Sequence, residues 1–227
     1  MVSKIMIFVA AALAVCAMGS EVAINDAERA SKKCSGKAIY LVQIDYLWTG
    51  ATHPFAYPDN GYFSPTAVAS HGNGFHLWTP HGYSTRGVEN VAERGRLSIL
   101  LGELAAQKGR NVFDFVYTEE RTEDGSETVK LLIKLDYTRP YVSGISMLTP
   151  SPDWFTGFDD ALLCVEGKWV KQYERNLSVW DAGTDKGEDF ESPNRNQFPR
   201  RPIVSILGSR FNSVPVGTVK IIRKRVF

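Results

Sequence analysis

The sequence predicts a mainly β protein, an antiparallel β-sandwich with one or two short helices. Short runs rich in β-branched and aromatic residues recur along the chain, with turn residues between them. Only two stretches carry a helical pattern, and no repeat or Pro/Gly/Ser-rich linker divides the chain. Regularly spaced strands with little helix favour a sandwich over a doubly wound parallel sheet.

The clearest strands and helices are predicted individually by composition and by their end signals. The expected strands are residues 38–44, 112–117, 128–135, 142–148 and 217–226. The expected helices are residues 87–93 and 97–107, the second ending near Gly109, where glycine can adopt a left-handed cap. Asp124-Gly125, at the centre of residues 121–126, predicts a tight hairpin between two of the strands.

The first twenty residues predict a secretory signal peptide. Lys4 precedes the apolar run 5–15, and small residues follow it at Ala17 and Gly19. This apolar run is shorter than the roughly twenty residues that cross a bilayer, and no later run is long or apolar enough. We therefore expect a secreted, extracellular protein without a membrane span, with a signal peptide at 1–20, a short polar leader at 21–33 and one domain at 34–227.

Charge and cysteine content support this expectation. The chain has 26 basic and 25 acidic residues, and loss of Lys4 brings the two into balance, so nothing favours a nucleic-acid partner. Loss of Cys16 with the signal leaves Cys34 and Cys164, an even pair in an oxidising compartment. We predict that they form a disulfide, which the chain-entropy treatment values at about 4 to 5 kcal/mol for so long a loop.

Three aspartates lie in segments stiffened by proline, glycine and tryptophan. Asp153 stands between Pro152 and Trp154, and Asp181 and Asp185 bracket a segment that contains Gly183. Calcium takes six to eight oxygen ligands, so carboxylates and carbonyls must converge from turns. These aspartates are candidate Ca²⁺ ligands, and the alternative is that they are ordinary turn residues that cap their own backbone. The pattern is not an EF-hand loop.

The same segments resemble the spondin domain of the F-spondin and mindin family. The most specific motifs are residues 150–155 (PSPDWF), 180–187 (WDAGTDKG) and 190–194 (FESPN). Weaker matches are residues 53–54 (HP), 63–65 (FSP), 70–71 (SH), 77–78 (LW), 82–95 (GYSTRGVENVAERG) and 163–164 (LC), together with Trp169. The resemblance extends from about Cys34 to the C-terminus.

This resemblance implies a sandwich like that of a C2 domain, a bound Ca²⁺ ion, and roles in matrix attachment, cell adhesion and innate recognition of microbial surfaces. Asp153, Asp181 and Asp185 occupy the positions of the family's calcium-binding aspartates. The remaining ligands would be carbonyls, water or a fourth acid, with Asp136, Asp159 and Asp160 nearby in sequence. The chain has neither a reelin-like domain nor thrombospondin repeats, so functions of those repeats, such as glycosaminoglycan attachment, do not transfer.

Two further features need an assignment. His53, His71, His76 and His81 lie within one short segment, but their spacing matches no standard zinc-ligand pattern, so we expect structural roles rather than a zinc site. Asn176-Leu177-Ser178 is a glycosylation sequon, which requires an exposed Asn176 and places a glycan near the candidate calcium loop.

Together these observations predict an extracellular calcium-binding module whose partner is a protein, a glycan or a microbial surface component. The alternative is a calcium-dependent lipid or lipopolysaccharide binder that uses aromatics such as Trp154 and Phe155. An enzyme is the least favoured class, because Ser151 and Ser178 lie in no nucleophile motif and no phosphate-binding glycine loop is present. The sequence does not indicate an oligomeric state.

Overall fold

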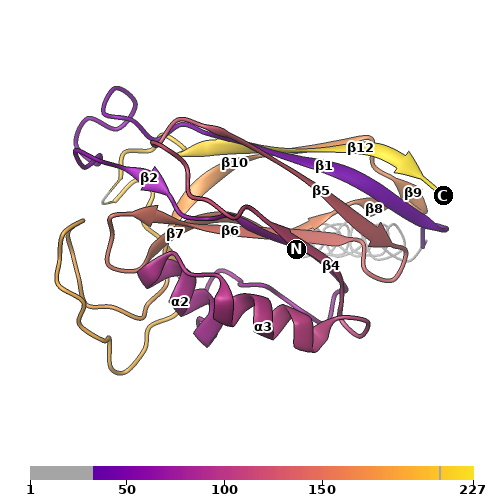
Figure 1. Cartoon of the computed structure of the whole chain (residues 1–227), viewed down its shortest axis with the longest axis horizontal. Helices are drawn as coiled ribbons and strands as arrows, with labels where there is room; N and C mark the ends of the chain where they lie inside the picture. The colour runs from indigo at the N-terminus through magenta and orange to yellow at the C-terminus, as the bar shows by residue number, and fades with distance from the viewer. Residues whose placement is uncertain (1–32, 210) are drawn as a thin grey trace, which may run out of the picture.

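A computed structural model describes residues 33–209 and 211–227 of the chain. The predicted signal peptide and all but the last residue of the predicted leader lie outside these ranges. In the described part, ten strands form one antiparallel sheet that folds over into two layers, and two helices cover the outer side of one layer (Figure 1). The predicted β-sandwich with short helices is confirmed.

Five of the strands were predicted from sequence to within one or two residues at each end. They are β1 (Lys37–Tyr46), β4 (Val112–Tyr117), β5 (Thr128–Asp136), β6 (Tyr141–Thr149) and β12 (Gly217–Val226). The remaining elements of the sheet are β2 (Tyr62–Phe63), β3 (Ala67–His71), β7 (Trp154–Leu162), β10 (Gln172–Asp181) and β11 (Val204–Ser205), and a separate hairpin pairs β8 (Cys164–Val165) with β9 (Lys168–Trp169).

The strand order is β4-β3-β6-β7-β10-β12-β1-β5, and the two end strands meet. The Asp114 carboxylate accepts the backbone N–H of Lys134 at 3.0 Å, which joins β4 to β5. The Ser70 hydroxyl of β3 donates to the Lys134 carbonyl at 2.7 Å. These bonds nearly close the sheet into a barrel and satisfy both backbone groups of Lys134 at the seam.

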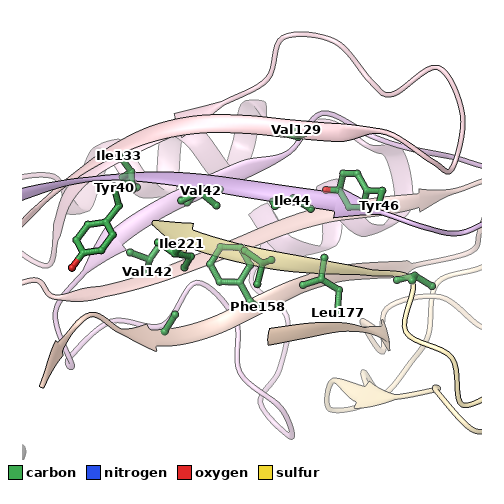
Figure 2. Packing of buried hydrophobic residues seen from close by; sticks show 14 of the residues in the cluster. Tyr40, Val42, Ile44, Tyr46, Val129, Ile133, Val142, Phe158, Leu177 and Ile221 are labelled. Atoms are coloured by element: carbon green, nitrogen blue, oxygen red, sulfur yellow. The ribbon is translucent and has the colours of Figure 1, made fainter. Parts of the chain in front are cut away.

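The main core lies between the two layers. Side chains alternate between the two faces of a strand, and β1 buries Tyr40, Val42, Ile44 and Tyr46 while its other residues face outward. Figure 2 shows these side chains of β1 among residues of β5, β6, β7, β10 and β12. Burial of each large apolar side chain stabilises the fold by about 1.5 to 3 kcal/mol.

Helices α2 (Arg86–Arg94) and α3 (Ser98–Gln107) cover the layer that contains β6 and β7 (Figure 1). The Thr85 hydroxyl caps α2 by accepting the Val88 N–H at 3.2 Å, and Gly95 ends the helix in the left-handed conformation. Gly109, two residues beyond α3, has φ +82° as predicted, but it does not cap the helix: the cap residue is Lys108 in an extended conformation, and the Gly109 N–H donates to the Val112 carbonyl. No helix in the described ranges is long and apolar enough to cross a membrane.

The predicted hairpin around Asp124-Gly125 is wrong. Strands β4 and β5 meet at the seam of the sheet but share no ladder of backbone hydrogen bonds, so the loop between them is not a tight hairpin turn. Gly125 is required for a different reason: its carbonyl accepts the Trp48 N–H at 2.7 Å, and a Cβ there would lie 1.8 Å from the Trp48 carbonyl oxygen. The dipeptide marks a close approach of two loops.

The predicted disulfide is confirmed. Cys34 and Cys164 are bonded, with their Cα atoms 5.9 Å apart. The bond ties the segment that precedes β1 to the β8–β9 hairpin, across a sequence separation of 130 residues. Because it closes so long a loop, it restricts the unfolded chain far more than a local bridge would.

Replacement of both Cys34 and Cys164 by serine should lower the free energy of unfolding by about 3 to 5 kcal/mol, because the unfolded chain regains loop entropy. Urea unfolding of the non-reduced protein, followed by tryptophan fluorescence, measures this difference. An unchanged unfolding midpoint would show that the bridge contributes nothing to stability.

Candidate metal-binding site

The three candidate aspartates lie at the same end of the sandwich. Asp153 directly precedes β7, Asp181 is the last residue of β10, and Asp185 follows in the loop. Strands β7 and β10 pair with Asp181 opposite Trp154, and this register brings the two motifs together from distant parts of the sequence. The loops beyond β6 and β10 extend from this end in Figure 1.

The Asp153 carboxylate holds the two loops together. Its Oδ2 accepts the backbone N–H of Thr184 at 2.7 Å and that of Asp185 at 3.0 Å. Its carbonyl accepts the Ala182 N–H at 3.1 Å. The side chain is fully buried. Asp153 is therefore the residue around which the loop after Asp181 folds.

The second carboxylate oxygen of Asp153 has unmet bonding capacity. Its Oδ1 is buried and has no hydrogen-bond partner. Burial and the nearby charges of Asp181 and Asp185 raise the pKa of Asp153 to about 7, although the N–H groups of Thr184 and Asp185 act in the opposite direction. A buried acceptor beside two other acids is an environment that a cation would stabilise.

Asp181 and Asp185 also shape their own loop. Asp181 Oδ1 accepts the Gly183 N–H at 2.8 Å. Asp185 is buried, and its two oxygens accept the N–H groups of Gly187 at 2.6 Å and Arg195 at 2.5 Å. Within residues 33–209 and 211–227, no group of three or more His, Cys, Asp and Glu side chains is already arranged to hold a metal. Each carboxylate oxygen keeps a second lone pair that can coordinate a cation, so these side chains remain suitable metal ligands.

Two glycines allow the loops to approach each other. Gly183 has φ +72°, and a Cβ there would lie 2.1 Å from the Arg201 carbonyl oxygen. A Cβ on Gly187 would lie 2.6 Å from Cβ of Pro152. The glycines in the predicted motif are thus required by sterics, because no larger side chain fits without moving backbone.

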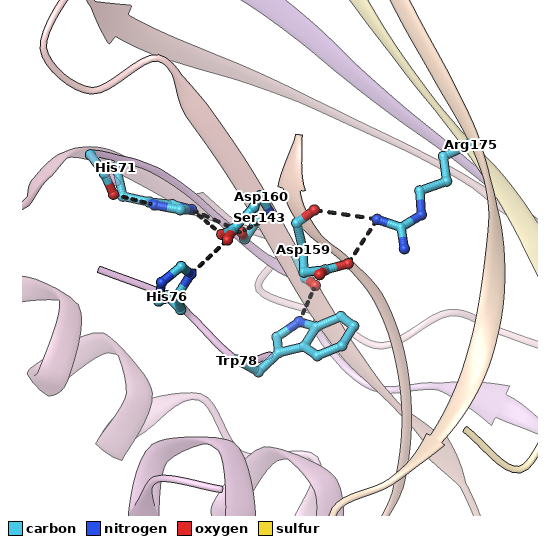
Figure 3. Close-up of polar contacts among 9 residues, drawn as sticks. His71, His76, Trp78, Ser143, Asp159, Asp160 and Arg175 are labelled. Atoms are coloured by element: carbon cyan, nitrogen blue, oxygen red, sulfur yellow. Dashed lines mark hydrogen bonds and ion pairs between the residues drawn. The ribbon is translucent and has the colours of Figure 1, made fainter. Parts of the chain in front are cut away.

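The acids considered as a fourth ligand are engaged elsewhere. Asp136 bonds the Arg139 guanidinium, and Asp159 pairs with Arg175 at 2.7 Å. Asp160, at a bulge where β7 is opposite β6, bonds His76 at 2.6 Å and lies 3.5 Å from His71 (Figure 3). Asp159 and Asp160 lie near the opposite end of β7 from Asp153, so neither completes the candidate site.

The histidines make structural contacts, as expected, and His71 and His76 share Asp160. His53 is buried and bonds the Thr52 hydroxyl and the Val214 carbonyl. His71 is buried and bonds Ser143, and burial lowers its pKa. His76 is half exposed beside Asp160 (Figure 3). His81 has φ +65°, and its N–H donates to the Ile203 carbonyl.

The other three predicted residues differ in exposure. Trp154 and Phe155 are buried, with 2% and 0% of their surface exposed, so they cannot contact a lipid. Trp154 packs against Phe190 and Phe211 instead. Asn176 lies exposed on the outer face of β10, as the glycosylation sequon requires. It precedes Asp181 by five residues along the strand, which corresponds to roughly 16 Å.

The fold and the site define a class of protein: an antiparallel β-sandwich with a carboxylate loop pair at one end. The sequence pattern of the Spondin_N family matches residues 38–214, and the chain therefore belongs to this family. Spondin-1 of Rattus norvegicus is 32% identical over 75% of the chain, and Spondin-2 of Homo sapiens is 29% identical over 78%. Spondin-1 of Gallus gallus is 30% identical over 84% of the chain.

The chain spans only part of these relatives, 22% of the rat Spondin-1 and 55% of the human Spondin-2. Membership of the family confirms the predicted secreted, extracellular localisation. The disulfide agrees with an oxidising compartment.

The pKa of Asp153 predicts a pH dependence of stability in the calcium-free protein. Because this pKa is raised to about 7, the folded state binds a proton more tightly than the unfolded chain. This contribution to stability is fully present below about pH 4 and is lost as the pH rises through about 7. At about 1.4 kcal/mol per pKa unit it amounts to at most about 4 kcal/mol.

Urea unfolding in chelator at pH 5 and pH 8 measures this dependence. The buried histidines have lowered pKa values, which make stability rise with pH instead. Comparison with Asp153→Asn separates the contribution of Asp153 from theirs. The variant should lose less stability than the wild type between the two pH values. Equal losses in both proteins would exclude Asp153 as the source.

Proposed function

We propose that this protein is a secreted calcium-binding module that serves matrix attachment, cell adhesion or the recognition of cell and microbial surfaces. The observation that supports the calcium site is the buried Asp153 Oδ1, which has no hydrogen-bond partner and lies beside the charges of Asp181 and Asp185. The family relationship supports the extracellular role.

Asp153, Asp181 and Asp185 would hold the ion, together with carbonyl oxygens or water. The ion would neutralise three neighbouring acids and cross-link the segment before β7 to the loop after β10. With three formal charges the site would belong to the weaker extracellular kind, with a Kd on the order of 10⁻⁴ to 10⁻³ M. This chain's own contribution is to hold the carboxylates in position through the N–H bonds from Thr184 and Asp185.

We infer a binding role rather than catalysis from the two serines considered as nucleophiles. The Ser151 hydroxyl accepts the Trp154 N–H at 3.1 Å and closes a turn. The Ser178 hydroxyl bonds the Ser205 hydroxyl at 3.0 Å. Neither contact supplies the adjacent base that activates a serine.

One observation favours the alternative of calcium-dependent lipid or lipopolysaccharide binding. Phe198 is 85% exposed, and the neighbouring Gln197 N–H donates to the Thr184 carbonyl at 2.7 Å, next to the candidate site. An exposed aromatic side chain beside a bound ion could enter a lipid layer. Phe198 thus takes the place of Trp154 and Phe155 in this alternative.

Calcium at 10 mM should stabilise the protein by about 1.4 to 2.7 kcal/mol at the proposed affinity, which raises the melting temperature by roughly 3 to 10 °C. Asp181→Ala should abolish this rise. Asp189→Ala removes an exposed acid of the same loop and should leave the rise unchanged. Scanning fluorimetry with calcium and with chelator tests this prediction, and an equal rise in the Asp181 variant would refute the assignment.

If the ion mediates contact, it is coordinated by both the ligand and the loops. Chelator should then weaken binding to immobilised matrix proteins, cells and bacterial surfaces at least about tenfold. Phe198→Ala should reduce binding to lipid vesicles alone if the alternative holds. Retention of all binding in chelator, with circular dichroism unchanged, would restrict calcium to a structural role.

A further inference from the structure

The outer face of the layer formed by β5, β1, β12 and β10 carries an ordered set of side chains. In Figure 1 the described helices lie on the far side of the other layer, so none of them covers this face. Residues directly opposite each other in neighbouring strands point to the same side of a sheet. Tyr40, Val42 and Ile44 point into the core, so Ile39, Leu41 and Gln43 point outward with their partners.

The strand register defines three parallel rows on this face. The central row is apolar: Leu41 lies opposite Leu132 on one side and Ile222 on the other, and Leu132 is 59% exposed. The other two rows each carry a basic residue on both sides of β1. Gln43 is flanked by Lys130 and Lys220, and Ile39 is flanked by Lys134 and Arg225.

Four cations therefore surround an apolar centre. We call this whole surface, cations and centre together, the basic sheet face. It is formed by Lys130, Lys134, Lys220 and Arg225 around Ile39, Leu41, Leu132 and Ile222. From the strand spacing and rise, the cations lie at the corners of an area of roughly 10 by 13 Å. Of the four, only Lys220 forms an ion pair within the described residues, with Glu174 at 3.7 Å.

The acids that border this face leave it positive. Glu174 lies opposite Lys220, Asp45 lies one row further along β1, and Asp114 of the neighbouring β4 accepts the Lys134 N–H. Asp45 is held by hydrogen bonds from Thr128 and Gln43, and the charges of Lys220 and Lys130 help to lower its pKa. Four cations against three acids is still a local excess in a chain whose basic and acidic residues otherwise nearly balance, 26 against 25. Such an excess attracts polyanions.

We propose that the basic sheet face binds a sulfated glycosaminoglycan chain. The cations match the sulfate and carboxylate groups along such a polymer, and the central row offers an apolar contact for its sugar rings. The apolar side chains stand on the face of regular strands rather than at loop tips, so they cannot enter a bilayer, which favours an extended polymer over a membrane. The proposal names a partner for the matrix role but uses a surface separate from the carboxylate site.

Surface plasmon resonance on immobilised heparin and chondroitin sulfate, with the full chain in chelator, tests the proposal. Wild type should bind at about 50 mM salt and dissociate as salt rises, because counterions compete for the polyanion. Lys130→Glu with Lys134→Glu should weaken binding at least about tenfold. Arg110→Glu with Lys168→Glu alters two other exposed cations by the same charge and should change affinity less than twofold.

Asp181→Ala should leave heparin binding unchanged, which separates this proposal from the calcium site. Protection of Lys130, Lys134 and Lys220 from acetylation by bound heparin, relative to Lys168, gives a readout on the unmutated protein. Absent binding at low salt, equal weakening in the control variant, or no protection would overturn the proposal. Tighter binding to phosphatidylserine vesicles, lost with the Lys130 and Lys134 substitutions, would overturn it in favour of a lipid surface.

Discussion

The carboxylate of Asp153 is the constraint on which this end of the molecule depends. One of its oxygens accepts two backbone N–H groups, from Thr184 and Asp185, and so fixes a loop 31 and 32 residues further along the chain. The arrangement buries an acid next to two others, and in the absence of a cation it raises the pKa of Asp153 to about 7. A bound cation would offset the repulsion among these acids.

Much of the fold was predictable because its signals are local. Alternating apolar residues fix β1 and β12, and both helices were predicted to within one residue of their observed ends. The Asp124-Gly125 hairpin failed because the same dipeptide also suits a loop that must pass close to Trp48. The strands β7 and β10 were not predicted, since their polar residues and motif tryptophans resemble loop sequence.

The candidate site was predicted in its residues but not in its bonding. Spacing and resemblance identified Asp153, Asp181 and Asp185, whereas the pairing of β7 with β10 that brings them together depends on long-range register. The hydrogen bonds that each aspartate makes, such as those of Asp185 with the N–H groups of Gly187 and Arg195, are visible only in three dimensions. The basic sheet face was not predicted, because its cations come from two strands, β5 and β12, that flank β1 only in the folded sheet.

The central claim is that the carboxylates around Asp153 bind one Ca²⁺ ion, and calorimetric titration of the chelator-treated protein with calcium tests it most directly. We expect a single site with a Kd on the order of 10⁻⁴ to 10⁻³ M, absent in Asp153→Asn, a variant that keeps side-chain volume. No heat of binding in the wild type, or an unchanged isotherm in the variant, would contradict it.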